Sequence, residues 1–172
     1  MKLYFFVAFL FLVFSKESCE AQTAPTASSG DLVWYTDLAK AQAASNQSNK
    51  PIFAFFTGSD WCGWCHKLQA EVFAKDAFKE WARQNVILLE LDFPRRKQLA
   101  PEIAQQNMNL QQAFQVRGYP TIWLFYAQTD PTTNEINLNA LGSTGYPAGA
   151  EAGKEEVKFL SDANAILANG KR

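Results

Sequence analysis

Two cysteines near the middle of the chain have the spacing of a working dithiol. Cys62 and Cys65 lie in the run Trp61–His66, which reads Trp-Cys-Gly-Trp-Cys-His and follows the apolar run 52–56. This order predicts a buried strand, a turn and a helix beginning near Cys62. Unpaired N–H groups and the dipole at a helix start favour a thiolate, and they lower a cysteine pKa from about 8.5 to roughly 3.5–7.5. We therefore predict Cys62 as the nucleophile and Cys65, one turn deeper, as the resolving thiol.

The same residues allow two other chemistries. Cys-x-x-Cys-His is also the attachment pattern of c-type haem, with His66 as axial ligand and Met108 as a distant second ligand. Interior strands argue against haem, because c-type haem domains are mostly helical. Alternatively, Cys62, Cys65 and His66 could bind copper or zinc as soft ligands, for binding or delivery of the metal. A closed zinc site needs four protein ligands, and the chain has a single His. We expect His66 to be solvated, and soft-metal binding or delivery stays the alternative function.

The start of the chain resembles an export signal. Residues 1–21 contain a charged Lys2, an apolar run from Leu3 to Phe14 and a small Ala21 suited to cleavage. The apolar run is shorter than the roughly 20 residues that a membrane-spanning helix needs. We therefore predict a signal peptide cleaved after Ala21 and no stable membrane span in the mature chain. Lipid anchoring at Cys19 is the less favoured alternative, because charged residues precede it instead of small and aliphatic ones.

Composition narrows the remaining classes. The formal net charge of −1 argues against a nucleic-acid partner, because phosphate binding needs clustered basic residues. Only three cysteines are present, too few for a scaffold held by several disulfides. Residues 22–30 are small and polar and predict a flexible lead-in. Residues 31–172 are then long enough for one domain with a proper core.

The periodicity of the rest of the chain predicts an α/β fold. Apolar runs without alternation at 52–56 and 86–91 are typical of strands buried on both faces. Weaker strands are expected at 32–35, 121–126 and 136–141, the last ended by two glycines, Gly142 and Gly145. Helices are expected at 38–47, from 62 through about 73, from 76, at 101–115 and at 155–167. Ser59 or Asp60 should cap the helix at Cys62, and Asp76 the next one. The order indicates a central mixed sheet with helices on both faces.

A second signature lies in Gly118-Tyr119-Pro120-Thr121. Together with Trp-Cys-x-x-Cys after a strand, it resembles the thioredoxin superfamily, and the wording of the turn is similar to bacterial exported members. The resemblance spans about residues 32–169. It implies a thioredoxin fold in the periplasm, with Pro120 in cis against the sulfurs and the Tyr119 backbone facing an extended substrate. It also implies exchange with protein thiols and disulfides, no bound cofactor, and recharging by a membrane reductase or another thioredoxin-like protein.

The chain departs from this family at three positions. Phe55 stands where thioredoxin has a buried Asp that deprotonates the second cysteine, and Glu90 stands where the neighbouring strand has a Lys. We hypothesise that Glu90 is the proton acceptor; the alternative is that it faces solvent. Trp64 replaces the Pro between the cysteines, so reduction, isomerisation and oxidation all stay open.

Two further features concern the substrate. Trp61 and Trp64 are expected to be exposed and to form an apolar rim for unfolded substrate. The basic run 95–97 should lie near Cys62, either as a solvated loop or as a steering element for acidic clients. The sequence as a whole thus predicts a periplasmic thiol–disulfide oxidoreductase acting through Cys-Gly-Trp-Cys.

Overall fold

A computed structural model describes residues 32–170. The predicted signal peptide, the predicted lead-in and Cys19 lie outside the described residues, so those assignments stay predictions. The elements, in chain order, are β1 (Trp34–Tyr35), α1 (Leu38–Ser48), β2 (Ile52–Thr57), α2 (Gly63–Leu68), a π-helical turn η1 (Gln69–Phe73), α3 (Asp76–Asn85), β3 (Ile87–Asp92), α4 (Pro101–Ala113), β4 (Thr121–Thr129), β5 (Ile136–Gly145) and α5 (Glu155–Asn169).

The strands form one mixed sheet in the order β1-β3-β2-β4-β5. β3 is parallel to both β1 and β2, whereas β4 is antiparallel to β2 and to β5. Every residue of β2 is buried, which explains its unalternating apolar sequence, because a central strand has helices over both of its faces. The predicted α/β architecture with a central mixed sheet is confirmed.

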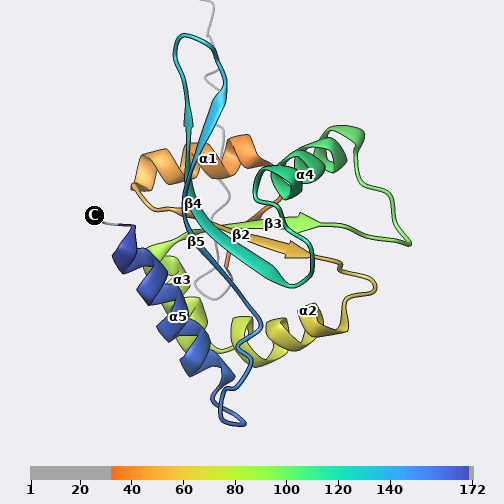
Figure 1. The fold of residues 1–172 in the computed structure, drawn as a ribbon, viewed down its shortest axis with the longest axis vertical. Coiled ribbons are helices and arrows are strands. Elements are labelled where there is room, and N and C mark those ends of the chain that lie inside the picture. Colours follow the sequence, from red (N-terminus) through yellow and green to blue (C-terminus); the bar gives the residue numbers. More distant parts are fainter. Residues whose placement is uncertain (1–31, 171–172) are drawn as a thin grey trace, which may run out of the picture.

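Helices cover the two faces of the sheet unequally (Figure 1). α1 and α4 lie on one face, over a core that includes Phe56, Leu91 and Phe125. α2, η1, α3 and α5 lie on the other face, over a core of interlocked aromatic rings that includes Phe53 and Phe55. Both cysteines of the motif belong to this second, aromatic core. The helix that begins within the motif, α2, is therefore packed against the sheet by its buried side.

The last strand differs from the prediction. Gly142 does not end β5, which continues through it in its pairing with β4 and ends at Gly145. A bulge at Leu141 shifts the register, since Leu124 pairs with Gly142 and Phe125 with Ala140. Both glycines serve close packing. A Cβ atom at Gly142 would lie 3.0 Å from Ile166 of α5, and one at Gly145 would lie 3.2 Å from the carbonyl oxygen of Pro120.

Two helix starts illustrate what a capping residue does. α1 begins at Leu38, where a helix was expected, and the Asp37 carboxylate caps it by accepting hydrogen bonds from the backbone N–H groups of Ala39 and Lys40. The prediction that Asp76 caps α3 is wrong by one position. Lys75 is the N-cap and makes no side-chain bond there, while Asp76 is the first helical residue, where its charge suits the helix dipole.

Within residues 32–170, no helix is both long and apolar enough to cross a membrane.

Candidate active site

The Cys62–Cys65 disulfide lies at the start of α2, directly after the turn that follows β2. The S–S distance is 2.08 Å, and the residues are 5% and 0% exposed respectively. Cys62 is itself the N-cap of α2, and its Sγ accepts a hydrogen bond from the Cys65 backbone N–H at 3.2 Å. The prediction that Ser59 or Asp60 caps this helix is therefore wrong. A donor aimed at Cys62 Sγ also stabilises negative charge there when the bond is reduced.

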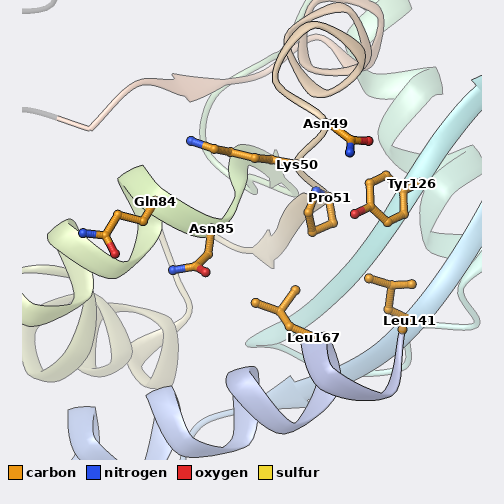
Figure 2. A pocket seen from close by; sticks show the side chains of 9 residues that line it. Asn49, Lys50, Pro51, Gln84, Asn85, Tyr126, Leu141 and Leu167 are labelled. Carbon is orange, nitrogen blue, oxygen red and sulfur yellow. The ribbon is translucent and has the colours of Figure 1, made fainter. Parts of the chain in front are cut away.

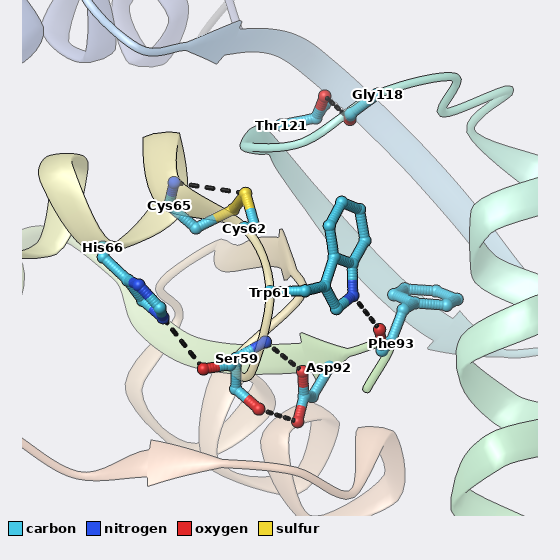
Figure 3. Close-up of a disulfide and its surroundings, with 9 residues drawn as sticks. All are labelled: Ser59, Trp61, Cys62, Cys65, His66, Asp92, Phe93, Gly118 and Thr121. Carbon is cyan, nitrogen blue, oxygen red and sulfur yellow. Dashed lines mark hydrogen bonds between the residues drawn. A yellow bond between two sulfur atoms is a disulfide. The ribbon is translucent and has the colours of Figure 1, made fainter. Parts of the chain in front are cut away.

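Ser59 instead holds the turn against the end of β3 (Figure 3), and Asp60 holds it against the loop that follows. The Asp92 carboxylate accepts hydrogen bonds from the Ser59 backbone N–H at 2.8 Å and from its hydroxyl at 2.7 Å. Lys97 Nζ lies 2.9 Å from the same carboxylate. Burial alone would raise the pKa of Asp92, but the bonds from Lys97 and Ser59 outweigh it and lower the pKa below its usual value. Asp92 thus stays charged and anchors the turn.

Trp61 is partly buried, so the expectation that it lies exposed in the turn is corrected. Its indole N–H donates to the Phe93 carbonyl at 2.8 Å, and its ring meets that of Tyr119 edge-on, with centroids 5.8 Å apart. The ring also covers Gly58, where an added Cβ would come within 2.4 Å of the indole. These contacts hold the Trp61 side chain in place between the motif and Tyr119.

Trp64 lies on the solvent side of the motif, as predicted, and is 58% exposed. Its ring meets Tyr146 edge-on at 4.9 Å, and Lys67 Nζ is 5.1 Å from each ring centroid. The Tyr146 hydroxyl donates to the Glu71 carboxylate. Sequence reasoning missed Tyr146. In the sequence, Tyr146 is marked only by its position directly after Gly145. In the structure, Gly145 pairs with Thr121, which follows Pro120.

The Gly-Tyr-Pro-Thr segment contributes the opposite side of the site. The Tyr119–Pro120 peptide bond is cis. Thr121 Oγ1 donates to the Gly118 carbonyl at 2.8 Å across the bend, and the Tyr119 hydroxyl accepts from Gln111 of α4 at 2.7 Å. Tyr119 packs against Trp61 and against Phe93, so this segment and the motif are held together by aromatic contacts. The structure brings the two sequence signatures to one place.

Glu90 shares the disulfide face of the sheet with Phe55, because the two residues are register partners in parallel strands. Phe55 is fully buried and Glu90 partly so. Burial raises the pKa of Glu90, the charge of Asp92 two residues on raises it further, and Lys97 opposes them. A cavity of about 220 Å³ at the open edge of β3 contacts Glu90, Asp92 and Lys97. The role of Glu90 as proton acceptor stays a prediction.

His66 lies apart from the sulfurs. It is exposed, and its Nε2 is 2.8 Å from the Ser59 carbonyl oxygen, so the ring turns toward the β2–α2 turn (Figure 3). No cluster of three or more His, Cys, Asp or Glu residues suited to a metal occurs in the described part of the chain. In this disulfide form, each cysteine sulfur is bonded to the other and the imidazole is engaged elsewhere.

A second cavity, of about 180 Å³, lies at the far end of the sheet, where β2 begins (Figure 2). Two of its polar side chains are already engaged: Lys50 Nζ donates to the Arg83 carbonyl at 2.6 Å, and Asn85 Nδ2 donates to the Trp81 carbonyl at 2.8 Å. The disulfide follows the opposite, C-terminal end of β2. This cavity is therefore not part of the candidate active site.

This chain is similar in sequence to a known family and to two curated proteins. A family model described as a thioredoxin-like domain matches residues 38–136. The chain is 39% identical over 101 residues to disulfide bond reductase DsbH of Chlamydia pneumoniae, which covers 59% of this chain and 60% of that protein. It is 27% identical over 161 residues to thioredoxin-related protein DsbJ of the same organism, which covers 94% of this chain and 44% of DsbJ. The chain thus spans roughly half the length of the curated relatives it matches.

Solved structures show the same fold. A DsbH oxidoreductase aligns with a TM-score of 0.66 at 30% identity, over 90% of this chain and 95% of that one. A thioredoxin from Thermus thermophilus aligns with a TM-score of 0.54 at 14% identity, over 81% and 89%, and shows the fold alone. The predicted thioredoxin fold is confirmed. The family model covers more than half of the chain and includes the disulfide, and the chain therefore belongs to the thioredoxin-like domain family.

Proposed function

We propose that this protein is a periplasmic thiol–disulfide oxidoreductase that reduces disulfides in protein substrates through its Cys-Gly-Trp-Cys motif. One observation carries the proposal: a Cys62–Cys65 disulfide at the start of α2, in a site where Trp61 packs against the segment that contains the cis Tyr119–Pro120 bond. The arrangement supplies an attacking sulfur, a second sulfur within reach of it, and a neighbouring strand end on which a peptide can lie.

The reaction proceeds by two exchanges. The Cys62 thiolate attacks one sulfur of the client disulfide; that S–S bond breaks, a mixed disulfide forms and one client thiolate leaves. The Cys65 thiolate then attacks Cys62 Sγ and releases the second client thiolate. Two electrons pass to the client, whose two sulfurs take up protons, and the Cys62–Cys65 disulfide remains. A dithiol reductant, such as a membrane reductase or another thioredoxin-like protein, must then reduce it.

The geometry supports one order of action for the two cysteines. The Cys65 N–H donates to Cys62 Sγ, which stabilises a thiolate at Cys62 more than at Cys65. Cys65 is fully buried beneath the first turn of α2, so a client disulfide reaches Cys62 first. A buried resolving thiol attacks only the sulfur presented to it, which limits side reactions with solvent thiols. These points support Cys62 as nucleophile and Cys65 as resolving thiol.

The direction and the location rest on different support. A relative that is 39% identical over the matched region is named a disulfide bond reductase, which favours reduction over oxidation. The export-signal pattern of residues 1–21 favours the periplasm, with cleavage after Ala21. N-terminal sequencing of the protein recovered from a bacterial periplasmic fraction tests the location. A chain that retains residue 1, or that is lipidated at Cys19, would contradict cleavage at Ala21.

Catalysed reduction of insulin by dithiothreitol tests the activity. The purified protein should accelerate precipitation of the insulin B chain, and Cys62→Ser should abolish the acceleration. Copper and zinc content is measured on the same reduced sample. Tight stoichiometric metal without turnover would contradict the proposal and favour the soft-metal alternative at Cys62, Cys65 and His66.

A further inference from the structure

The loop that follows β3 is docked onto the active-site turn through one exposed carboxylate. Asp60 accepts a hydrogen bond from the Arg96 backbone N–H at 2.6 Å and from the Arg95 backbone N–H at 3.0 Å. The bond from the Arg95 backbone is the main cause that lowers the pKa of Asp60. The carboxylate is thus charged, and it faces backbone donors instead of arginine side chains. Its negative charge fixes the path of the loop.

The position of this loop places the Arg95 guanidinium over the Trp61 ring, at the edge of the active site. The Arg95 Cζ lies 3.8 Å from the ring centroid of Trp61, the residue that precedes Cys62. At this distance the guanidinium lies against the ring face, which leaves its N–H edges free to donate outward. Arg95 is exposed, and within residues 32–170 no carboxylate lies within the 4.0 Å of an ion pair with it.

Two lysines near the motif are already paired, whereas the Arg96 side chain, next to Arg95, has no ion pair within residues 32–170. Lys97 is bound to Asp92, and Lys67 lies 3.9 Å from Glu71. Asp60 is occupied by the loop backbone. Among the described residues, the rim beside Cys62 therefore carries positive charge that has no ion-pair partner, and the Arg95 guanidinium is the part of it that packs on Trp61. A carboxylate brought to this rim would find a planar donor that is already held in place, so little side-chain entropy would be lost on binding.

From this geometry we infer that Arg95 selects client disulfides that have an acidic residue next to the attacked cysteine. The inference rests on the proposed function, since it names the class of client that the same site prefers. The client's Asp or Glu pairs with the Arg95 guanidinium while the neighbouring sulfur faces Cys62. Asp60 is the positioning residue, because it holds the loop from which Arg95 reaches Trp61.

Three synthetic peptides test this inference. Each carries one intramolecular disulfide, and they differ only in the residue that precedes the first cysteine: Glu, Gln or Lys. The reduced protein is mixed rapidly with each peptide, and the second-order rate of disulfide formation in the protein is followed by tryptophan fluorescence. The Glu peptide should react about threefold to tenfold faster than the Lys peptide, as expected for an exposed but preorganised charge pair. The ratio should fall when salt rises above about 0.15 M.

Variants separate Arg95 from a general effect of charge. Arg95→Ala should bring the Glu-to-Lys rate ratio close to one, and Arg95→Lys should retain part of it, since a point charge lacks the planar fork. Asp60→Asn should also reduce the ratio. Lys40→Ala, which removes an exposed positive charge from α1 on the other face of the sheet, is the matched control and should keep the wild-type ratio. Because the readout is a ratio, a uniform change in reactivity does not alter it.

The failures of the two proposals are distinguishable. If wild type reduces all three peptides at one rate, or if Arg95→Ala keeps the wild-type ratio, the inference about Arg95 is overturned while thiol–disulfide exchange stands. If the protein reduces none of the peptides and does not accelerate insulin reduction, both the proposed function and the inference are overturned.

Discussion

Replacing Asp92 by Asn tests whether one buried carboxylate holds the active-site turn in place. Asp92 is 5% exposed at the end of β3 and accepts two hydrogen bonds from Ser59, while Lys97 Nζ lies 2.9 Å from it. An Asn side chain has one acceptor oxygen in place of two. It can keep the bond from the Ser59 backbone, but it loses the ion pair and presents an N–H₂ group toward Lys97. The turn that leads to Cys62 would then be held by one neutral bond.

The magnitude follows from the contacts that are lost. A hydrogen bond to a charged group contributes about 1.5–3 kcal/mol of net stability. Lys97 is 55% exposed, so its ion pair adds no more than about 1 kcal/mol after solvent screening. Part of the Ser59 interaction survives in the amide. We therefore expect Asp92→Asn to lower the free energy of unfolding by about 2–3 kcal/mol at pH 7.

The pH dependence has a definite sign. The pKa of Asp92 is lower in the folded protein than its usual value near 3.8, so the ionised carboxylate stabilises the fold above that value. This contribution disappears as the pH falls through the lowered, folded-state pKa. The difference in stability between wild type and Asp92→Asn should therefore be complete at pH 7 and should shrink below about pH 4.

Urea denaturation followed by circular dichroism measures this difference at several pH values. Asp76→Asn is the matched control. The Asp76 side chain is fully exposed, and its one ion pair, with Lys79 at 3.5 Å, lies on the surface. The control should change stability by less than about 0.5 kcal/mol. An Asp92→Asn variant as stable at pH 7 as the control, or one whose deficit persists unchanged in acid, would refute the reasoning.

Three further predictions concern the site itself. Cys65→Ser should accumulate mixed disulfides with client proteins on non-reducing gels, whereas Cys62→Ser should accumulate none; the opposite pattern would reverse the roles. Glu90→Gln should slow release of client from the mixed disulfide by about 10²–10⁴-fold between pH 5 and 9 if Glu90 is the proton acceptor, and overlapping rates would show that it is not. Since the pKa of Glu90 is raised, its charged form destabilises the fold, so the same variant should be at least as stable as wild type at pH 7. This advantage should fade as the pH falls through the raised folded-state pKa, and it should be absent below about pH 4. Gly58→Ala should displace Trp61, seen as a shift in its fluorescence and a loss of stability of about 1–3 kcal/mol, because the new Cβ would come within 2.4 Å of the indole.

The sequence predicts most of the fold because each buried strand and each helix has its own periodic pattern. β2 is the clearest case, since six successive buried residues need helices on both faces of the sheet. The end of β5 was not predictable in this way. The sequence places the end of β5 at the first glycine, but Gly142 stays in the strand, close to Ile166 of α5, and β5 ends only at Gly145. Such an approach depends on tertiary packing and leaves no local signal.

The site shows the same division. The spacing of the cysteines indicated one side of the site, and the resemblance to the thioredoxin superfamily added the Gly-Tyr-Pro-Thr segment. The helix cap was misassigned, because Ser59 is bonded to Asp92 at the end of β3 and Asp60 to the loop after β3, and not to the nearby helix N-terminus. Tyr146 and Asp92 were missed for the same reason. Their roles come from side chains distant in the sequence, Trp64 and Ser59 respectively, and only the folded chain brings them into contact.

The reduction potential of the Cys62–Cys65 couple tests the central claim most directly. The protein is equilibrated with dithiothreitol or glutathione buffers of graded ratio, and the fraction of disulfide is measured by thiol alkylation and mass spectrometry. A protein that reduces client disulfides should have a potential near the roughly −270 mV of thioredoxin. A value near the roughly −120 mV of a strong oxidant, or cysteines that do not titrate as a single two-electron couple, would contradict the account.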